Sequence, residues 1–135
     1  MRGSVYFHKN LPLSTGREKD KLLVQVNTPS KKEPYLLYLT TSQPKSRPET
    51  PGCISRLSLF YVEAGKPFFD KNTWIQLDEL YEFDSAYIIK MGLQKEMREL
   101  GIIPNQKMNE IANCFRRIDD VSKYNLGLIL KSKEA

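Results

Sequence analysis

The sequence predicts an α+β domain in which a small, strongly bent sheet or barrel comes first and the helices that follow pack over one side of it. Three observations predict this class. The chain has 135 residues, which is room for one compact domain. Several short runs rich in β-branched and aromatic residues occupy the first half, and the hydrophobic period changes to a helical one near residue 85. We therefore expect a single domain over 1–135, with a β-barrel part at 1–84 and a helical part at 85–135.

Turn-forming residues divide the first half into about five expected strands. These strands are expected at 4–7, 22–26, 35–40, 57–62 and 74–77. A polar loop is expected from His8 to about Asp20, and the segment 27–34 is expected to close a β-hairpin because it has two prolines and no apolar residue. Prolines and a glycine interrupt 43–54, so this segment cannot be a central strand or a helix.

The second half predicts two or three helices. Apolar residues spaced three and four apart predict one helical face, and they are Ala86, Ile89, Leu93, Met97 and Leu100. Asp84 or Ser85 is expected to cap the start of this helix, and Gly101 to lie just past its end. A second helix is expected over about 105–118 with Asn105 as its cap, because the same spacing recurs at Met108, Ile111, Ala112, Phe115 and Ile118. Ser122 is expected to cap a short third helix.

Positive charge is concentrated in the first half of the chain. The formal net charge is +5, yet residues 1–66 carry 11 basic and 5 acidic side chains, a net charge of +6. A basic first half suggests one basic face of the folded protein, and such a face favours a polyanionic partner. Ordinary solvated loops give the same composition.

The cysteine and apolar content exclude several classes of protein. Cys53 and Cys114 are expected to be reduced thiols packed as small hydrophobic side chains. His8 is the single histidine, so a Cys/His zinc cluster is excluded, and we expect neither a metal nor a cofactor. Apolar runs are far shorter than a membrane span, and no signal-peptide pattern follows Met1. We therefore expect no membrane partner and a cytoplasmic location.

Basic and hydroxyl side chains lie where the expected strands end. In a small barrel these ends can converge, and a cation beside hydroxyl groups makes a workable phosphate site. The same groups could stabilise the pentacoordinate transition state of RNA cleavage by the 2′-hydroxyl, which needs no metal. The candidates that contact RNA are Lys19, Lys21, Thr40, Ser42, Lys45 and Arg47. The candidates for catalysis are Arg17, Thr41 and His8.

Aromatic side chains in the expected strands allow two interpretations. Trp74, Tyr35, Tyr38, Phe60 and Tyr61 could stack on bases, but their alternating positions are more typical of a core.

Four segments resemble the MazF/PemK-like toxin family over about residues 3–84. They are the opening strand 3–6, the charged loop with Gly16 and Arg17, the strand 22–26, and the segment 39–43 with its two threonines. A fifth, 74–83, is similar to a later strand of that family, although it is acidic where the family has a basic residue. The family's loop arginine aligns with Asp20, which Lys19 and Lys21 flank.

The resemblance implies an SH3-like β-barrel of about five to seven strands followed by helices, usually in dimers. It also implies a metal-independent endoribonuclease that acts on single-stranded RNA and is restrained by an antitoxin protein. The family's strand-end hydroxyl corresponds to Thr41, which would hold a phosphate oxygen. Arg17, with Lys19 or Lys21, would stabilise the developing charge, and His8 is a candidate general base because its ordinary pKa suits proton transfer near neutrality.

Two alternatives stay open at the level of sequence. The same surface could bind RNA or a protein without catalysis, which the absent loop arginine and the acidic segment 78–84 favour. The helical tail could instead dock a partner protein.

Overall fold

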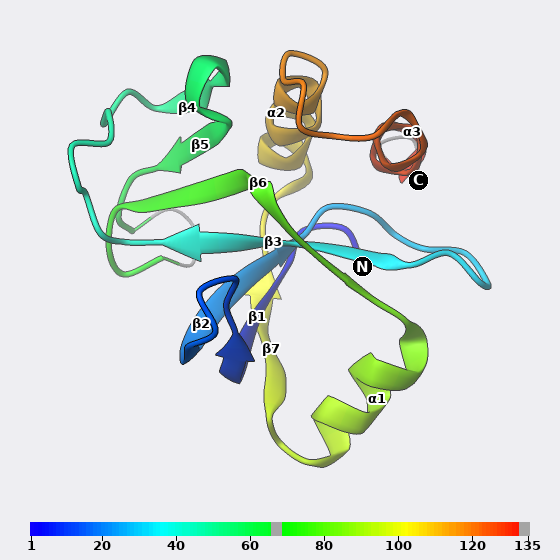
Figure 1. The fold of residues 1–135 in the computed structure, drawn as a ribbon. Coiled ribbons are helices and arrows are strands. Elements are labelled where there is room, and N and C mark those ends of the chain that lie inside the picture. The colour runs from blue at the N-terminus through cyan, green and yellow to red at the C-terminus, as the bar shows by residue number, and fades with distance from the viewer. Residues whose placement is uncertain (66–68, 133–135) are drawn as a thin grey trace.

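A computed structural model describes residues 1–65 and 69–132, and in it the chain forms an α+β fold around one antiparallel sheet (Figure 1). The strands are β1 (Ser4–Pro12), β2 (Glu18–Gln25), β3 (Tyr35–Thr41), β4 (Gly52–Ile54), β5 (Leu59–Val62), β6 (Thr73–Phe83) and β7 (Met97–Ile102). The helices are α1 (Ser85–Leu93), α2 (Asn105–Phe115) and α3 (Lys123–Ser132), with a short 3-10 helix at Ser55–Leu57. The strand order is β4-β5-β6-β3-β2-β1-β7. The α+β class is thus confirmed, and within the described residues the sheet is open because its edge strands β4 and β7 do not pair.

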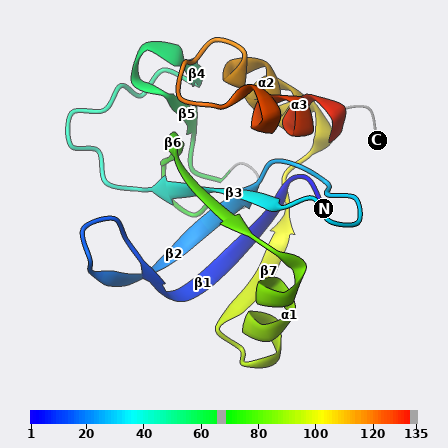
Figure 2. The same ribbon diagram turned by 45° about the vertical axis from the view of Figure 1, so that its right-hand side comes forward.

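Helices cover both faces of the sheet, whereas the sequence predicted helices on one side. Alternate residues of β3 divide between two cores, because successive side chains of a strand point to opposite faces. Leu36 and Tyr38 pack in the cluster that contains Ile111 and Phe115 of α2. Leu37 and Leu39 pack in the cluster that contains Ile88 of α1 together with Met91. Figures 1 and 2 show α2 and α3 on one side of the sheet and α1 on the other.

The strand β7 replaces the second half of the helix that the sequence predicted over 86–100. The helix ends at Leu93, and after a turn in which Lys95 has φ +59° the chain pairs with β1 from Met97 to Ile102. Gly101 therefore lies in a strand, opposite Val5, and does not end a helix. On the predicted apolar face, Ile89 is 61% exposed and Leu93 is 80% exposed. Ile88 and Met91 of α1 pack on the sheet instead.

The helix caps agree in part with the sequence. Asp84 caps α1 by accepting a hydrogen bond from the Tyr87 N–H (2.7 Å), and Ser122 accepts one from the Asn125 N–H (3.1 Å). Asn105 does not cap α2, because it is the first residue of the helix and its side chain accepts a hydrogen bond from Arg2.

The polar loop predicted over 8–20 is a β-hairpin. β1 continues to Pro12 and β2 begins at Glu18, so only a short turn separates them. The predicted hairpin around 27–34 is confirmed by the pairing of β2 with β3. The other predicted strands are present with shifted ends, and β6 is longer than expected, at 11 residues. The sequence also predicts a turn at 65–67, where a glycine and a proline lie, and this segment is partly outside the described residues.

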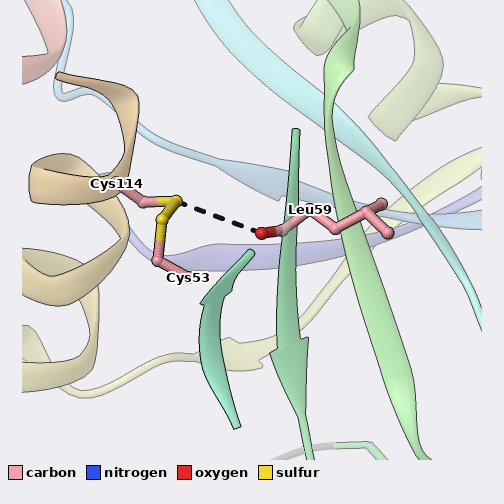
Figure 3. Close-up of a disulfide and its surroundings, with 3 residues drawn as sticks. All are labelled: Cys53, Leu59 and Cys114. Carbon is pink, nitrogen blue, oxygen red and sulfur yellow. Dashed lines mark hydrogen bonds between the residues drawn. A yellow bond between two sulfur atoms is a disulfide. The ribbon is translucent and has the colours of Figure 1, made fainter. Parts of the chain in front are cut away.

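A disulfide joins Cys53 of β4 to Cys114 of α2, so the prediction of two reduced thiols is wrong (Figure 3). The two Cα atoms lie 5.5 Å apart, although 61 positions separate the residues along the chain. Cys114 is buried, and its sulfur lies 4.0 Å from the Leu59 carbonyl oxygen. A disulfide sulfur carries no proton, so this approach is a packing contact. The bond fastens the edge of the sheet to α2.

Candidate nucleic-acid interface

The start of β2 and the end of β3 lie side by side, and this neighbourhood contains most of the predicted site. Leu23 pairs with Leu39, and the Thr40 hydroxyl donates a hydrogen bond to the Leu22 carbonyl (2.8 Å). Continuing this register by two residues beyond the Leu23–Leu39 pair places Lys21 across from Thr41, and both residues line one pocket. Figures 1 and 2 show the β1–β2 hairpin and the segment between β3 and β4 on the same side of the molecule.

Four basic side chains, Lys19, Lys21, Lys45 and Arg47, form what we call the cationic cluster. Burial lowers the pKa of the half-buried Lys21 ammonium, and the charges of Lys19, Arg47 and Lys45 lower it further. In the part of the chain that the structure describes, the ion pairs join Lys107 to Glu110 and Lys131 to Glu33. No carboxylate therefore pairs with a member of the cluster there. Arg47 does interact at longer range with Asp78. An array of cations crowded without partners is a binding surface for an anion.

A bulge in β1 positions the first two members of the cluster. His8 pairs with Lys21 and Leu11 with Lys19, so β1 has an extra residue between these pairs. Asn10 has φ +53° there, and its N–H donates to the Asp20 carboxylate (3.0 Å).

A tight turn positions the other two members. The Arg47 N–H donates to the Pro44 carbonyl (2.6 Å), and Lys45 and Ser46 have φ of +40° and +66°. Non-glycine residues in this region cost about 1 to 2 kcal/mol each, so the surrounding contacts must hold the turn in place. The Arg47 guanidinium donates back to the Gln43 carbonyl (2.6 Å), and the Trp74 indole N–H donates to the Pro48 carbonyl (2.8 Å).

The hydroxyl residues differ in what they can offer a ligand. The Thr40 hydroxyl is buried and donates its hydrogen bond to the Leu22 carbonyl, so Thr40 links β3 to β2. The Thr41 hydroxyl accepts a hydrogen bond from the Gln43 N–H (3.2 Å), and its proton has no acceptor among the described residues. Ser42 is exposed. Thr41 and Ser42 are thus the candidates for a phosphate oxygen, although Thr41 is only 8% exposed.

Two predicted catalytic residues do not serve this arrangement, because His8 is buried although it pairs with Lys21, and Arg17 lies farther along the hairpin. His8 is 2% exposed, and its ring nitrogens bond the Lys9 carbonyl oxygen (2.9 Å) and the Tyr87 hydroxyl (2.7 Å). A histidine satisfied in the interior does not fit a base that must reach an RNA hydroxyl, so we remove His8 from the site. Arg17 is exposed in the turn of the β1–β2 hairpin, where its carbonyl accepts from the Leu13 N–H. It lies four residues from Lys21, roughly 13 Å along an extended strand.

The aromatic residues are core and not a stacking platform. Trp74, Tyr38, Phe60 and Tyr61 are 4% exposed or less, and Tyr35 is partly buried. Trp74 packs on Tyr61, with ring centroids 4.9 Å apart.

A pocket of about 390 Å³ adjoins the cationic cluster. Its lining residues are Asp20, Lys21, Leu22, Thr40, Thr41, Ser42, Phe69, Asp70, Lys71, Thr73 and Leu100. The sequence did not single out Asp70, Lys71, Thr73 or Leu100 as site residues. They lie 29 or more residues from β3 along the chain, and no local pattern marks them.

Neither a scan against protein-family models nor a search of curated proteins found a match to this chain. Within residues 1–65 and 69–132, no three His, Cys, Asp or Glu side chains are grouped so as to hold a metal ion. No helix in these ranges is long and apolar enough to cross a membrane.

Proposed function

We propose that this protein is a metal-independent endoribonuclease that cleaves single-stranded RNA at the cationic cluster. The observation that carries the proposal is the position of Lys21, which lines one pocket with Thr41 and is crowded by Lys19, Lys45 and Arg47. A phosphodiester bound there would relieve the mutual repulsion of the four cations, so the site favours the RNA backbone over a neutral ligand.

The lowered pKa of Lys21 suits a proton donor. In the proposed reaction the RNA 2′-oxygen attacks phosphorus, and the bond from phosphorus to the 5′-oxygen breaks. The 2′-hydroxyl proton leaves to solvent, and Lys21 gives its proton to the departing 5′-oxygen. Arg47 and the two other lysines offset the extra negative charge of the pentacoordinate phosphorus, and Thr41 donates to one of its oxygens. The products are a 2′,3′-cyclic phosphate and a 5′-hydroxyl.

The finer features implied by the MazF/PemK-like resemblance belong to this proposal. They are the SH3-like barrel, the homodimer, the antitoxin partner and the cytoplasmic location. The seven antiparallel strands support the barrel, and the threonine at the end of β3 supports the strand-end hydroxyl of the family. The disulfide bears on the location, because cytosolic thiol systems reduce most exposed disulfides, and of its two residues Cys114 is 1% exposed while Cys53 is partly buried.

The test is incubation of RNA with the purified protein in EDTA, with the product ends identified. We expect 2′,3′-cyclic phosphate ends from the wild type, and a loss of about a hundredfold or more in rate for Lys21→Ala. Lys32→Ala is the matched control, because Lys32 is an exposed lysine in the turn between β2 and β3. If the RNA stays intact although the wild-type protein is folded, the proposed endoribonuclease activity is refuted.

A second candidate is RNA binding without cleavage, and the burial of His8 favours it because this imidazole, although His8 pairs with Lys21, is closed off from RNA. Four neutralised phosphates give a slope of log K against log salt of about −3 for single strands. This slope without cleavage would support the second candidate, and a slope near zero would reject both.

A further inference from the structure

We propose that the pocket beside the cationic cluster is a guanine-binding subsite, which holds the base of a nucleotide next to the bound phosphodiester. This inference rests on the proposed function and deepens it by naming the base. The pocket shares Lys21, Thr41 and Ser42 with the phosphate site, so a nucleotide can place its phosphate on the cluster and its base in the pocket.

The size and the apolar lining of the pocket suit a flat base. Its volume of about 390 Å³ is in the range of small-molecule sites. Phe69 is 2% exposed, and with Leu22 and the 45% exposed Leu100 it supplies the apolar part of the lining. Bases of single-stranded RNA are commonly taken out of the stack and held in this way.

Charge separates the two halves of the site. Asp20 and Asp70 line the pocket together with Lys21 and Lys71, so the pocket has no excess of positive charge to compete with the cationic cluster for a phosphate. One Asp20 oxygen accepts from the Asn10 N–H, which orients this carboxylate. Among the described residues no hydrogen bond or ion pair engages the exposed Asp70 carboxylate, so in that part of the chain nothing competes with a ligand for its two oxygens.

Guanine is the base whose edge matches this set of groups. A carboxylate can accept the adjacent N1–H and N2–H of guanine as two parallel hydrogen bonds, as it accepts the fork of an arginine. Adenine, cytosine and uracil each offer a single donor position on that edge. Lysine is a common partner of the guanine O6 and N7 acceptors, and Lys71 lies beside Asp70 in the lining. The Asp70 carboxylate would therefore accept from the guanine N1–H and N2–H, while the Lys71 ammonium donates to the guanine O6 and N7.

The test is titration of the full chain with 3′-GMP, 3′-IMP, 3′-AMP, 3′-CMP and 3′-UMP. We expect 3′-GMP to bind tightest, and 3′-IMP to bind roughly tenfold more weakly because hypoxanthine lacks the N2 amino group. In Asp70→Asn the difference between 3′-GMP and 3′-IMP should shrink to within about threefold. Asp119→Asn is the control, because Asp119 is an exposed acid after α2 and outside the pocket lining.

Oligonucleotide binding separates a failure of this inference from a failure of the proposed function. Equal affinity for all five nucleotides would overturn the subsite, and a retained salt slope for single-stranded RNA would then leave the proposed function standing. A preference for 3′-GMP that depends on Asp70, with no binding of oligonucleotides, would support the pocket and reject the RNA-cleaving function. A preference for 3′-GMP that Asp70→Asn leaves intact would overturn the assigned contact.

Discussion

Reduction of the disulfide between Cys53 and Cys114 should cost this protein a large part of its stability. The bond closes a loop whose ends are 61 positions apart. In the chain-entropy description, a cross-link of that span removes about 4 kcal/mol of conformational freedom from the unfolded chain. Domains of this size are stable by only about 5 to 15 kcal/mol, so the loss is a substantial share of the total.

The assay is urea unfolding with and without a phosphine reductant, followed by the fluorescence of Trp74. Trp74 is the single tryptophan and is fully buried, so its emission reports directly on the core beside the 43–51 segment. With a urea slope of about 2 kcal/mol per molar, the midpoint should fall by about 2 M on reduction. In a thermal scan the same loss corresponds to a decrease in Tm of about 15 °C.

The double variant Cys53→Ala/Cys114→Ala is the control, because its midpoint should not respond to the reductant. The reasoning is refuted if the wild-type midpoint moves by less than about 0.3 M on reduction. It is also refuted if the unreduced protein, unfolded in urea, titrates with two free thiols, because the bond would then be absent.

Two further predictions concern the frame that holds the site. Gly3→Ala should destabilise the fold by about 3 kcal/mol, because Gly3 has φ +94° and an added Cβ would lie 2.8 Å from the Ile103 carbonyl oxygen. Gly92→Ala in α1, where a Cβ meets no atom within 4 Å, should be neutral or stabilising, and equal unfolding midpoints for the two variants would contradict the argument. Stability should also fall as the pH rises above about 10, because burial raises the pKa of Tyr38 and the unfolded chain then releases a proton that the folded chain keeps. Unfolding midpoints between pH 8 and 11 should fall less steeply for Tyr38→Phe, and parallel slopes would count against this assignment.

Local patterns were sufficient for the elements whose signals lie within a few residues. The two prolines of 27–34 end one strand and precede the next, so the hairpin of β2 and β3 could be predicted. The helical spacing of Met108, Ile111 and Phe115 identified the buried face of α2, and Ser122 marked the start of α3. The same local reasoning failed over 97–102. There, the spacing of a few apolar residues favours a helix, but a helix would leave the edge of β1 without hydrogen-bond partners. Pairing of β7 with β1 satisfies the backbone groups of both strands.

The candidate site could be predicted only in part. The sequence indicated that the lysines before the second strand belong near the threonines that end the third, because adjacent strands bring such positions together. It could not show that Tyr87, 79 residues away, bonds His8 in the interior, or that the exposed Arg17 stays in the hairpin turn. It also gave no signal for Asp70 and Lys71, which the chain brings to the pocket from beyond β5.

The sequence by itself determined the α+β class, the order of most elements and the basic character of the first half, because these depend on composition and short periodicities. Only the tertiary structure decided the edge strand β7, the disulfide between β4 and α2, and which cations gather around Lys21. The physical reason is that these features are contacts between distant segments. Their free energy depends on the burial and pairing that the whole sheet provides, and no window of neighbouring residues contains that information.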